Sequence, residues 1–319
     1  MNSAGTDISV DFLFETQNSD GCFPEFVYIL KDKTWRKTKP TVFSTALISG
    51  AISEVLKYKA SLSESSGVKC ETILKKTLDF FITQMKMPGL WKFGITGDAQ
   101  WKALPYDLDD TCCVSQLLKN YHPYIHFGMN KNHILKNRNG EGIFYTWLLP
   151  PSMAHRNDTD SVVNANTILY LGEIPETTRA IDYICDLVNS GKEEGSFYYY
   201  LDKRALYYFI SRAYSAGVGG FSKCRDKIIR NITGDDPGKI KFLMNAIGVT
   251  TLINFGYEER DLFTQRVKIL TDHIGEKGNW PMSPVYQGAE YPKPIGLYWG
   301  SEGISTALCL EAIVKSSLL

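Results

Sequence analysis

The stretch DLDDTCCVSQLLKNY, residues 107–121, opens with three carboxylates in four positions and continues as an apolar run with helical character. Aspartate is favoured at the N-cap and first turn of a helix, where its oxygens accept hydrogen bonds from free backbone N–H groups. Capping explains one acid, Asp107, but not all three. The stretch therefore predicts a buried helix whose N-terminal end carries a cluster formed by Asp107, Asp109 and Asp110.

Similar apolar segments recur along the chain, most of them near a short glycine-aromatic motif. Gly-x-aromatic tripeptides begin at residues 21, 89, 142, 195 and 278, at intervals of 68, 53, 53 and 83 residues. Most are followed within about twenty residues by a segment of small and apolar residues, and a helix that is hydrophobic on every side is expected to be buried. Six segments have this character: 40–56, 107–121, 161–173, 204–217, 240–256 and 300–314.

Segments with one apolar side lie between them, at residues 71–85, 176–190 and 259–275. In the last of these, apolar residues recur at three- and four-residue steps, as on the covered side of a surface helix. Alternating inner and outer helices predict an all-α fold, an α/α barrel of six inner and up to six outer helices. We expect a single domain over residues 1–319. An open α-solenoid is the rival, but its repeats usually keep a stricter period.

Composition excludes several classes of protein. The formal net charge is zero, so no strong field favours nucleic acid. The seven cysteines form no C-x-x-C pair and the five histidines show no zinc-ligand spacing, which predicts reduced thiols and no bound metal. The N-terminus has no export signal, and no apolar run approaches the roughly 18 residues that span a bilayer. We expect a cytoplasmic protein.

An offset of 53 residues aligns the second and third repeats, and it separates the acids by role. Asp107 falls on Asp160, whereas Asp109 and Asp110 fall on two valines. We therefore predict that Asp107 and Asp160 are helix caps and that the other two carboxyls point into the barrel mouth. Adjacent carboxylates cannot all ionise cheaply, so one retains a proton. The helix N-terminus favours the anion, which makes that group a stronger acid, suited to protonating an alkene or epoxide.

A carbocation made in this way needs shielding from water and aromatic faces that attract it. Aromatic residues are 13% of the chain. Asn164 and Asn166, in the neighbouring inner segment, are candidates for a hydrogen bond to Asp109 or for setting where the cation is quenched; helix capping or packing is the equal alternative. The aromatic candidates for the cavity wall are Trp91, Phe144, Trp147, Tyr199, Tyr208, Trp280 and Trp299.

The sequence DLDDT, residues 107–111, resembles the D-x-D-D-T motif of class II terpene cyclases, the squalene–hopene cyclase-like and copalyl diphosphate synthase-like enzymes. The Gly-x-aromatic turns resemble the degenerate aromatic repeats of that family, although the Gln-x-x-x-x-x-Trp form is missing. The family fold is an α/α barrel. The resemblance implies that Asp109 is the proton donor and that Asp107 and Asp110 hold and tune it.

It further implies protonation-initiated cyclisation of an isoprenoid alkene or epoxide, or of a prenyl diphosphate such as farnesyl or geranylgeranyl diphosphate. No cofactor is expected, and Mg²⁺ only if the substrate carries a diphosphate. Cations at the mouth would then be needed, with Lys102, Arg156, Lys203 and Arg204 as candidates. A hydrophobic substrate favours loose membrane association.

The chain departs from the family in size. Most class II cyclases pair two barrel domains, and this sequence resembles one of them over nearly its whole length. Either one barrel closes the site, or a second cyclase domain on another chain or a second copy of this chain supplies the missing wall, or activity is lost.

Of the other functions that could explain these acidic residues, the sequence argues against two and leaves two open. Class I terpene synthases need D-D-x-x-D, but Cys113 and Lys239 stand where the last acid should be, and the zinc ligands of protein prenyltransferases are not found. A glycoside hydrolase using Asp109 with Asp158 or Asp160 stays open, as does a non-catalytic barrel that binds an isoprenoid or a partner. An aromatic cavity beside the acids would favour the cyclase, and an open polar groove the hydrolase.

Overall fold

The structure is a computed structural model, and it describes residues 3–122, 124–125, 127–290 and 293–317. Most of these residues are helical, and each of the six predicted inner segments forms a helix. The inner helices are α2 (Val42–Leu56), α5 (Leu108–Tyr121), α7 (Ser161–Leu171), α9 (Lys203–Ser215), α11 (Phe242–Asn254) and α13 (Glu302–Ser316).

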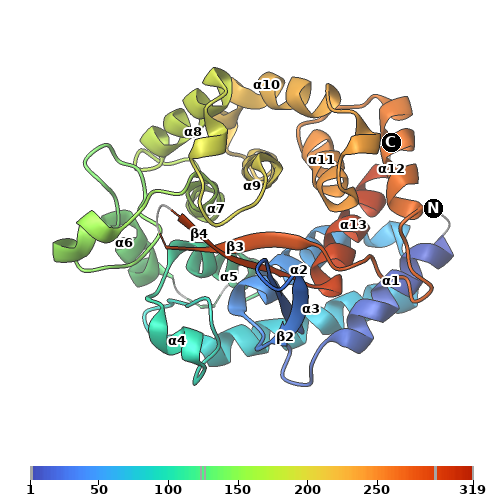
Figure 1. The fold of residues 1–319 in the computed structure, drawn as a ribbon, viewed down its shortest axis with the longest axis horizontal. Coiled ribbons are helices and arrows are strands. Elements are labelled where there is room, and N and C mark those ends of the chain that lie inside the picture. The colour runs from blue at the N-terminus through green and yellow to red at the C-terminus, as the bar shows by residue number, and fades with distance from the viewer. Residues whose placement is uncertain (1–2, 123, 126, 291–292, 318–319) are drawn as a thin grey trace.

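The inner helices follow one another in space as they do in sequence. Each contacts the next, and α13 contacts α2, so within the described residues the six helices close a ring. Helices α2, α7, α11 and α13 are buried along nearly their whole length, as their uniformly apolar sequences require. In Figure 1, α7, α9, α11 and α13 lie around the middle of the molecule, with α8, α10 and α12 at the periphery.

The outer helices cover this ring with one apolar side each. Helix α3 packs on α2, α8 on α7 and α12 on α11. These three are the predicted one-sided segments. No described helix is both long enough and apolar enough to cross a membrane. In all, the described α-helices outside the ring are α1 (Ser3–Thr16), α3 (Glu64–Gln84), α4 (Ala99–Ala103), α6 (Gly128–Lys136), α8 (Thr178–Ser190), α10 (Ser222–Thr233) and α12 (Arg260–Thr271).

Short 3₁₀ helices connect several of these elements. They are η1 (Lys59–Ser61), η2 (Pro151–Arg156), η3 (Glu193–Gly195), η4 (Gly219–Phe221) and η5 (Pro237–Lys239).

The fold is mostly helical, as predicted, but the prediction of an all-α fold omitted an antiparallel sheet that the described residues form, in the order β2-β1-β4-β3. Strands β1 (Glu25–Ile29) and β2 (Thr34–Thr38) precede the first inner helix, and β3 (Pro284–Glu290) and β4 (Lys293–Gly300) precede the last. The pairing of β1 with β4 joins the two ends of the chain, and the sheet crosses the middle of the view in Figure 1. Its aromatic and β-branched residues suit strands. Among the described strands, β1–β2 and β3–β4 are hairpins close in sequence, and only the pairing of β1 with β4 joins distant segments.

The Gly-x-aromatic repeat has a structural cause. The glycines at 21, 89, 142 and 278 have positive φ angles, which favour glycine. The backbone N–H of each following aromatic donates to a buried side chain on the next inner helix. The four bonds are Phe23 to Thr45 Oγ1, Trp91 to Thr111 Oγ1, Phe144 to Asn164 Oδ1 and Trp280 to Thr306 Oγ1, at 3.3, 3.2, 2.9 and 3.0 Å.

The two tryptophans of this repeat make a second bond. The indole Nε1 of Trp91 donates to the carbonyl of Phe81 in α3, and that of Trp280 donates to Leu270 in α12, both at 2.8 Å. Each of these turns therefore fastens an outer helix to the inner helix that follows it.

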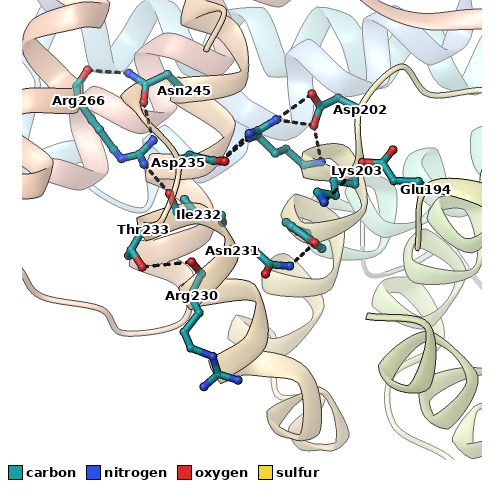
Figure 2. Close-up of polar contacts among 12 residues, drawn as sticks. Glu194, Asp202, Lys203, Arg230, Asn231, Ile232, Thr233, Asp235, Asn245 and Arg266 are labelled. Atoms are coloured by element: carbon teal, nitrogen blue, oxygen red, sulfur yellow. Dashed lines mark hydrogen bonds and ion pairs between the residues drawn. The ribbon is translucent and has the colours of Figure 1, made fainter. Parts of the chain in front are cut away.

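A buried arginine joins three helices, α10, α11 and α12. Arg266 of α12 donates to Asn245 Oδ1 of α11 at 2.8 Å and to the carbonyl of Ile232 near the end of α10 at 2.5 Å. Asn245 returns a bond to the Arg266 carbonyl at 3.0 Å, and Figure 2 shows the three residues together. A guanidinium is well suited to such multiple bonding because its donors are held in a plane.

We expect Thr306→Val to lower the free energy of unfolding by about 1–3 kcal/mol, because the buried N–H of Trp280 loses its acceptor. Thr306→Ser retains the hydroxyl and should lose less. Urea unfolding of the three proteins measures this. Equal stability of the valine and parent proteins would show that the turn bond contributes nothing.

Candidate active site

The three acids converge where α5 begins. Asp107 is the N-cap, and its Oδ1 accepts the backbone N–H of Asp110 at 2.8 Å. Asp109 and Asp110 occupy the first turn, and all three carboxyls are buried. All three also line one cavity. The capping role predicted for Asp107 is thus confirmed, and the capping bond leaves its other oxygen, Oδ2, without a partner.

Asp109 is held by two neighbouring repeats. Its Oδ1 accepts Nδ2 of Asn166 on α7, and its Oδ2 accepts the hydroxyl of Tyr200, which precedes α9, both at 2.6 Å. Donors to both oxygens favour the carboxylate, so they stabilise Asp109 after it loses a proton. A proton on Asp109 must use a lone pair that these bonds leave free.

Burial governs the protonation of the cluster. It raises the pKa of Asp109 to about 7, with a further increase from the negative charge of Asp107 and a decrease from the Tyr200 and Asn166 bonds. Burial likewise raises the pKa of Asp107 to about 6. The pKa of Asp110 lies well above its usual range because burial and the charge of Asp107 act together. The cluster therefore carries protons near neutral pH.

Asp160 plays the structural part predicted for it. Its Oδ1 accepts the N–H groups of Val162 and Val163 at the start of α7, at 2.7 and 3.2 Å. Its Oδ2 accepts the N–H groups of Tyr198 and Tyr199 at 2.6 and 3.3 Å. Both oxygens of Asp160 are fully used in joining α7 to the segment before α9.

The cavity beside the acids is mostly apolar and has a volume of about 290 Å³. The sheet supplies one wall, where Tyr286 and Trp299 stack with their ring centroids 6.1 Å apart and planes at 2°. Phe93 directs its edge at both rings, with centroids 5.8 and 5.7 Å away. The lining aromatic residues are Phe43, Phe93, Trp147, Tyr199, Tyr200, Tyr286 and Trp299.

The structure divides the predicted wall residues into two groups. Trp147, Tyr199 and Trp299 line the cavity, and Asn166 contacts Asp109. Five other candidates do not line it, because they pack between the helices instead. These are Trp91, Phe144 and Trp280 at the repeat turns, Asn164, which bonds the backbone of Phe144, and Tyr208, whose hydroxyl donates to Glu311.

Several site residues were missed from the sequence. Tyr286 donates its hydroxyl to Glu25, and it also lies 3.3 Å from Thr41 Oγ1. Glu25 is wholly buried, which raises its pKa to about 7. Phe43 directs an edge at Tyr286, with centroids 5.0 Å apart. The β-branched Val285 beside the aromatic Tyr286 in PVYQ, residues 284–287, was the available signal for the strand that places Tyr286.

The candidates for binding a diphosphate do not reach this cavity. Among the residues described, no lysine or arginine lines it. Arg204 forms ion pairs with Asp202 and Asp235. The ammonium group of Lys203 lies 3.5 Å from a carboxylate oxygen of Glu194 (Figure 2). Lys102 and Arg156 also lie outside the lining. The part of the chain that the structure describes contains no group of three His, Cys, Asp or Glu residues placed to hold a metal ion.

Comparison with known proteins places the fold. No family model and no curated protein matches the chain. Two solved structures of variants of the type II terpene cyclase MstE from Scytonema cover 99% of this chain and 97% of their own. The apo form has a TM-score of 0.69 at 14% identity, and the complex with the substrate geranylgeranyl dihydroxybenzoate 0.67 at 13%.

A larger enzyme shares part of this architecture. The ent-copalyl diphosphate synthase from Streptomyces platensis matches 86% of this chain over 50% of its own length, with a TM-score of 0.57 and 13% identity. The chain thus has the fold of type II terpene cyclases.

We expect Asp109→Asn to stabilise the protein, and to do so more at pH 8 than at pH 5. The pKa of Asp109 is raised by burial, so stability is greatest at acidic pH and is lost as pH rises through about 7. Asparagine has no such ionisation. The difference between the two stabilising effects should be on the order of 2 kcal/mol, measured by urea unfolding. Equal effects at both pH values would mean that Asp109 ionises freely.

Proposed function

We propose that this chain is a class II terpene cyclase with an α/α barrel, in which Asp109 of the D-x-D-D-T sequence is the general acid. The observation that carries the proposal is a buried carboxyl with a pKa near neutrality that lines an aromatic cavity. A general acid works best when its pKa lies close to the operating pH, since it is then both protonated and able to release the proton.

The reaction begins with transfer of the Asp109 proton to one carbon of an isoprenoid double bond, whose π electrons form the new C–H bond. The other carbon becomes a tertiary cation. Asn166 and Tyr200 stabilise the carboxylate left behind, and the N-terminus of α5 favours the negative charge. The negative charge of Asp107 favours a protonated Asp109 before the step, and Asp110, whose pKa lies well above its usual range, stays neutral beside it.

The cavity wall then controls the cation. Aromatic faces attract a desolvated cation by about 2 kcal/mol or more without reacting with it. The small polar surface of the wall keeps water, the competing nucleophile, away from the intermediate. The stacked pair Tyr286 and Trp299, with Phe93 against them, gives the chain of the substrate a shaped surface on which to fold.

The substrate that fits best is an isoprenoid alkene or epoxide with a head group other than a diphosphate. A diphosphate is usually held by arginine, lysine or metal ions, and the described cavity lining offers no such cation. The geranylgeranyl dihydroxybenzoate bound by MstE supports a prenylated aromatic compound as the class to test first. The residues that β3 and β4 supply support a site in which this chain itself provides an aromatic surface beside the acids.

The hydrolase reading has less support. Two carboxyls about 5–9.5 Å apart must face one sugar and leave room for it or for water. Both oxygens of Asp160 accept hydrogen bonds from backbone N–H groups, and neither Asp160 nor Asp158 lines the cavity beside Asp109. A non-catalytic binding barrel would explain the caps and the cavity but not the proton-retaining acid at its wall.

We expect the purified protein to convert at least one member of a prenyl panel to a cyclic isomer, detected by mass spectrometry. The panel contains prenylated dihydroxybenzoates and their epoxides, squalene, oxidosqualene, and farnesyl and geranylgeranyl diphosphates. Asp109→Asn should lower the rate by about 10²–10⁴-fold, because it removes the general acid. No turnover of any member by folded protein, or equal turnover by Asp109→Asn, would contradict the proposal.

The rate should also fall as pH rises through about 7, because only protonated Asp109 can act. Tyr200→Phe removes a bond that lowers this pKa, so the midpoint of the pH profile should move upward. Rates of the parent and variant across pH 5–9 test this. A midpoint that stays in place would mean that Tyr200 does not tune the acid.

A further inference from the structure

Asp158 is a buried carboxylate that the proposed mechanism leaves unused. It lies behind the cavity wall, where its Oδ1 accepts the hydroxyl of Thr146. Its Oδ2 accepts the indole Nε1 of Trp147 at 3.2 Å and the hydroxyl of Tyr199 at 2.7 Å. All three donor residues line the cavity, although Asp158 itself does not. One carboxyl group therefore fixes three neighbouring wall residues.

Trp147 and Tyr199 form a right-angled pair. Their ring centroids are 5.7 Å apart with planes at 87°, and the Trp147 indole also donates to the Tyr199 hydroxyl at 2.9 Å. The pair lies beside the acid cluster, since Trp147 faces Asp107 in an antiparallel bridge and Tyr199 precedes Tyr200 in the chain. A cation formed next to Asp109 would therefore lie in the same cavity as these rings.

The bonds to Asp158 favour its ionised form. It accepts from three side chains and donates to none, which satisfies a carboxylate. Burial raises the pKa of Asp158, and the same three bonds lower it. A negative charge behind the rings, away from water, makes the potential at their cavity faces more negative because the local dielectric is low.

The adjoining strand β3 repeats the arrangement, since Tyr286 pairs with Tyr200 in an antiparallel bridge. Tyr286 donates its hydroxyl to the buried carboxyl of Glu25. With Tyr200 bonded to Asp109, each tyrosine among the described lining residues thus donates its hydroxyl to a buried carboxyl. These bonds fix the orientation of the three phenol groups at the cavity.

We propose that Asp158 is a positioning residue that holds Trp147 and Tyr199 as a cation-binding pair and strengthens their attraction for a carbocation. The inference deepens the proposed function, because the natural cation is the intermediate of that reaction. It concerns charge recognition, however, and can be measured by binding alone.

The test compares two probes: a geranyl chain ending in a trimethylammonium group and the same chain ending in a tert-butyl group. The probes match in shape, and the charge of the first does not depend on pH. Calorimetric titration gives the affinity of each for the parent, Asp158→Asn, Tyr199→Phe and Glu193→Gln. Glu193 is the matched control, a buried carboxyl that accepts the hydroxyl of Tyr207 outside the cavity lining.

We expect the parent to bind the ammonium probe more tightly than the tert-butyl probe. Asp158→Asn should lower the ratio of the two affinities by about tenfold, the scale of one cation–π contact. Tyr199→Phe should lower the ratio less, because the ring stays but loses its bond to the carboxylate. Glu193→Gln should leave the ratio unchanged.

Three results would overturn the inference: a parent with no preference for the ammonium probe, an unchanged ratio in Asp158→Asn, or an equal loss for both probes, which would indicate a purely structural role. If Asp158→Asn does not fold, Tyr199→Phe takes its place: a lower ratio of the two affinities supports the inference, and an unchanged ratio overturns it. Failure of the prenyl panel to turn over would contradict the proposed function and leave this ratio standing, so the two failures are distinguishable.

Discussion

Burial of a carboxyl group at the N-terminus of an inner helix is the constraint on which the site depends. Burial alone would leave Asp109 neutral and weakly acidic, and exposure would leave it ionised and useless as an acid at neutral pH. The structure places it between these limits, with a pKa raised to about 7 and with donors from Asn166 and Tyr200 ready for the anion. Two neighbouring repeats must be held in register for both donors to reach it.

The helix ring and its turns provide that register. Four of the five Gly-x-aromatic turns bond forward to the next inner helix, and Trp91 and Trp280 bond back to the outer helix before it. The sheet then brings Tyr286 and Trp299 across from the far end of the chain to face the acids. The repeats thus supply the acids and part of the cavity wall, and the strands that break the repeat supply the rest. This separation lets the wall change while the acid stays in place.

The sequence predicted the parts of the fold that depend on local pattern. The inner helices are apolar on all sides, and Asp107 and Asp160 have the positions and neighbours of caps, so these predictions are confirmed. The sheet was missed because its short strands show no strict two-residue period, and because the β1–β4 pairing that unites its two hairpins joins distant segments. The role of Trp91 was misplaced because an aromatic ring suits helix packing as well as a cavity, and residue type alone does not separate the two. The identity of Tyr200 as a donor to Asp109 depends on that same long-range geometry.

The central claim is that a proton from Asp109 becomes part of a carbon skeleton. Running the prenyl panel in D₂O, after exchange of the protein, tests this most directly. If Asp109 supplies the proton, a product of alkene cyclisation carries one deuterium bound to carbon, retained after return to H₂O and located by NMR at the carbon that was protonated. A cyclic product formed in D₂O without carbon-bound deuterium would contradict the claim, because the reaction would then begin by a route other than protonation.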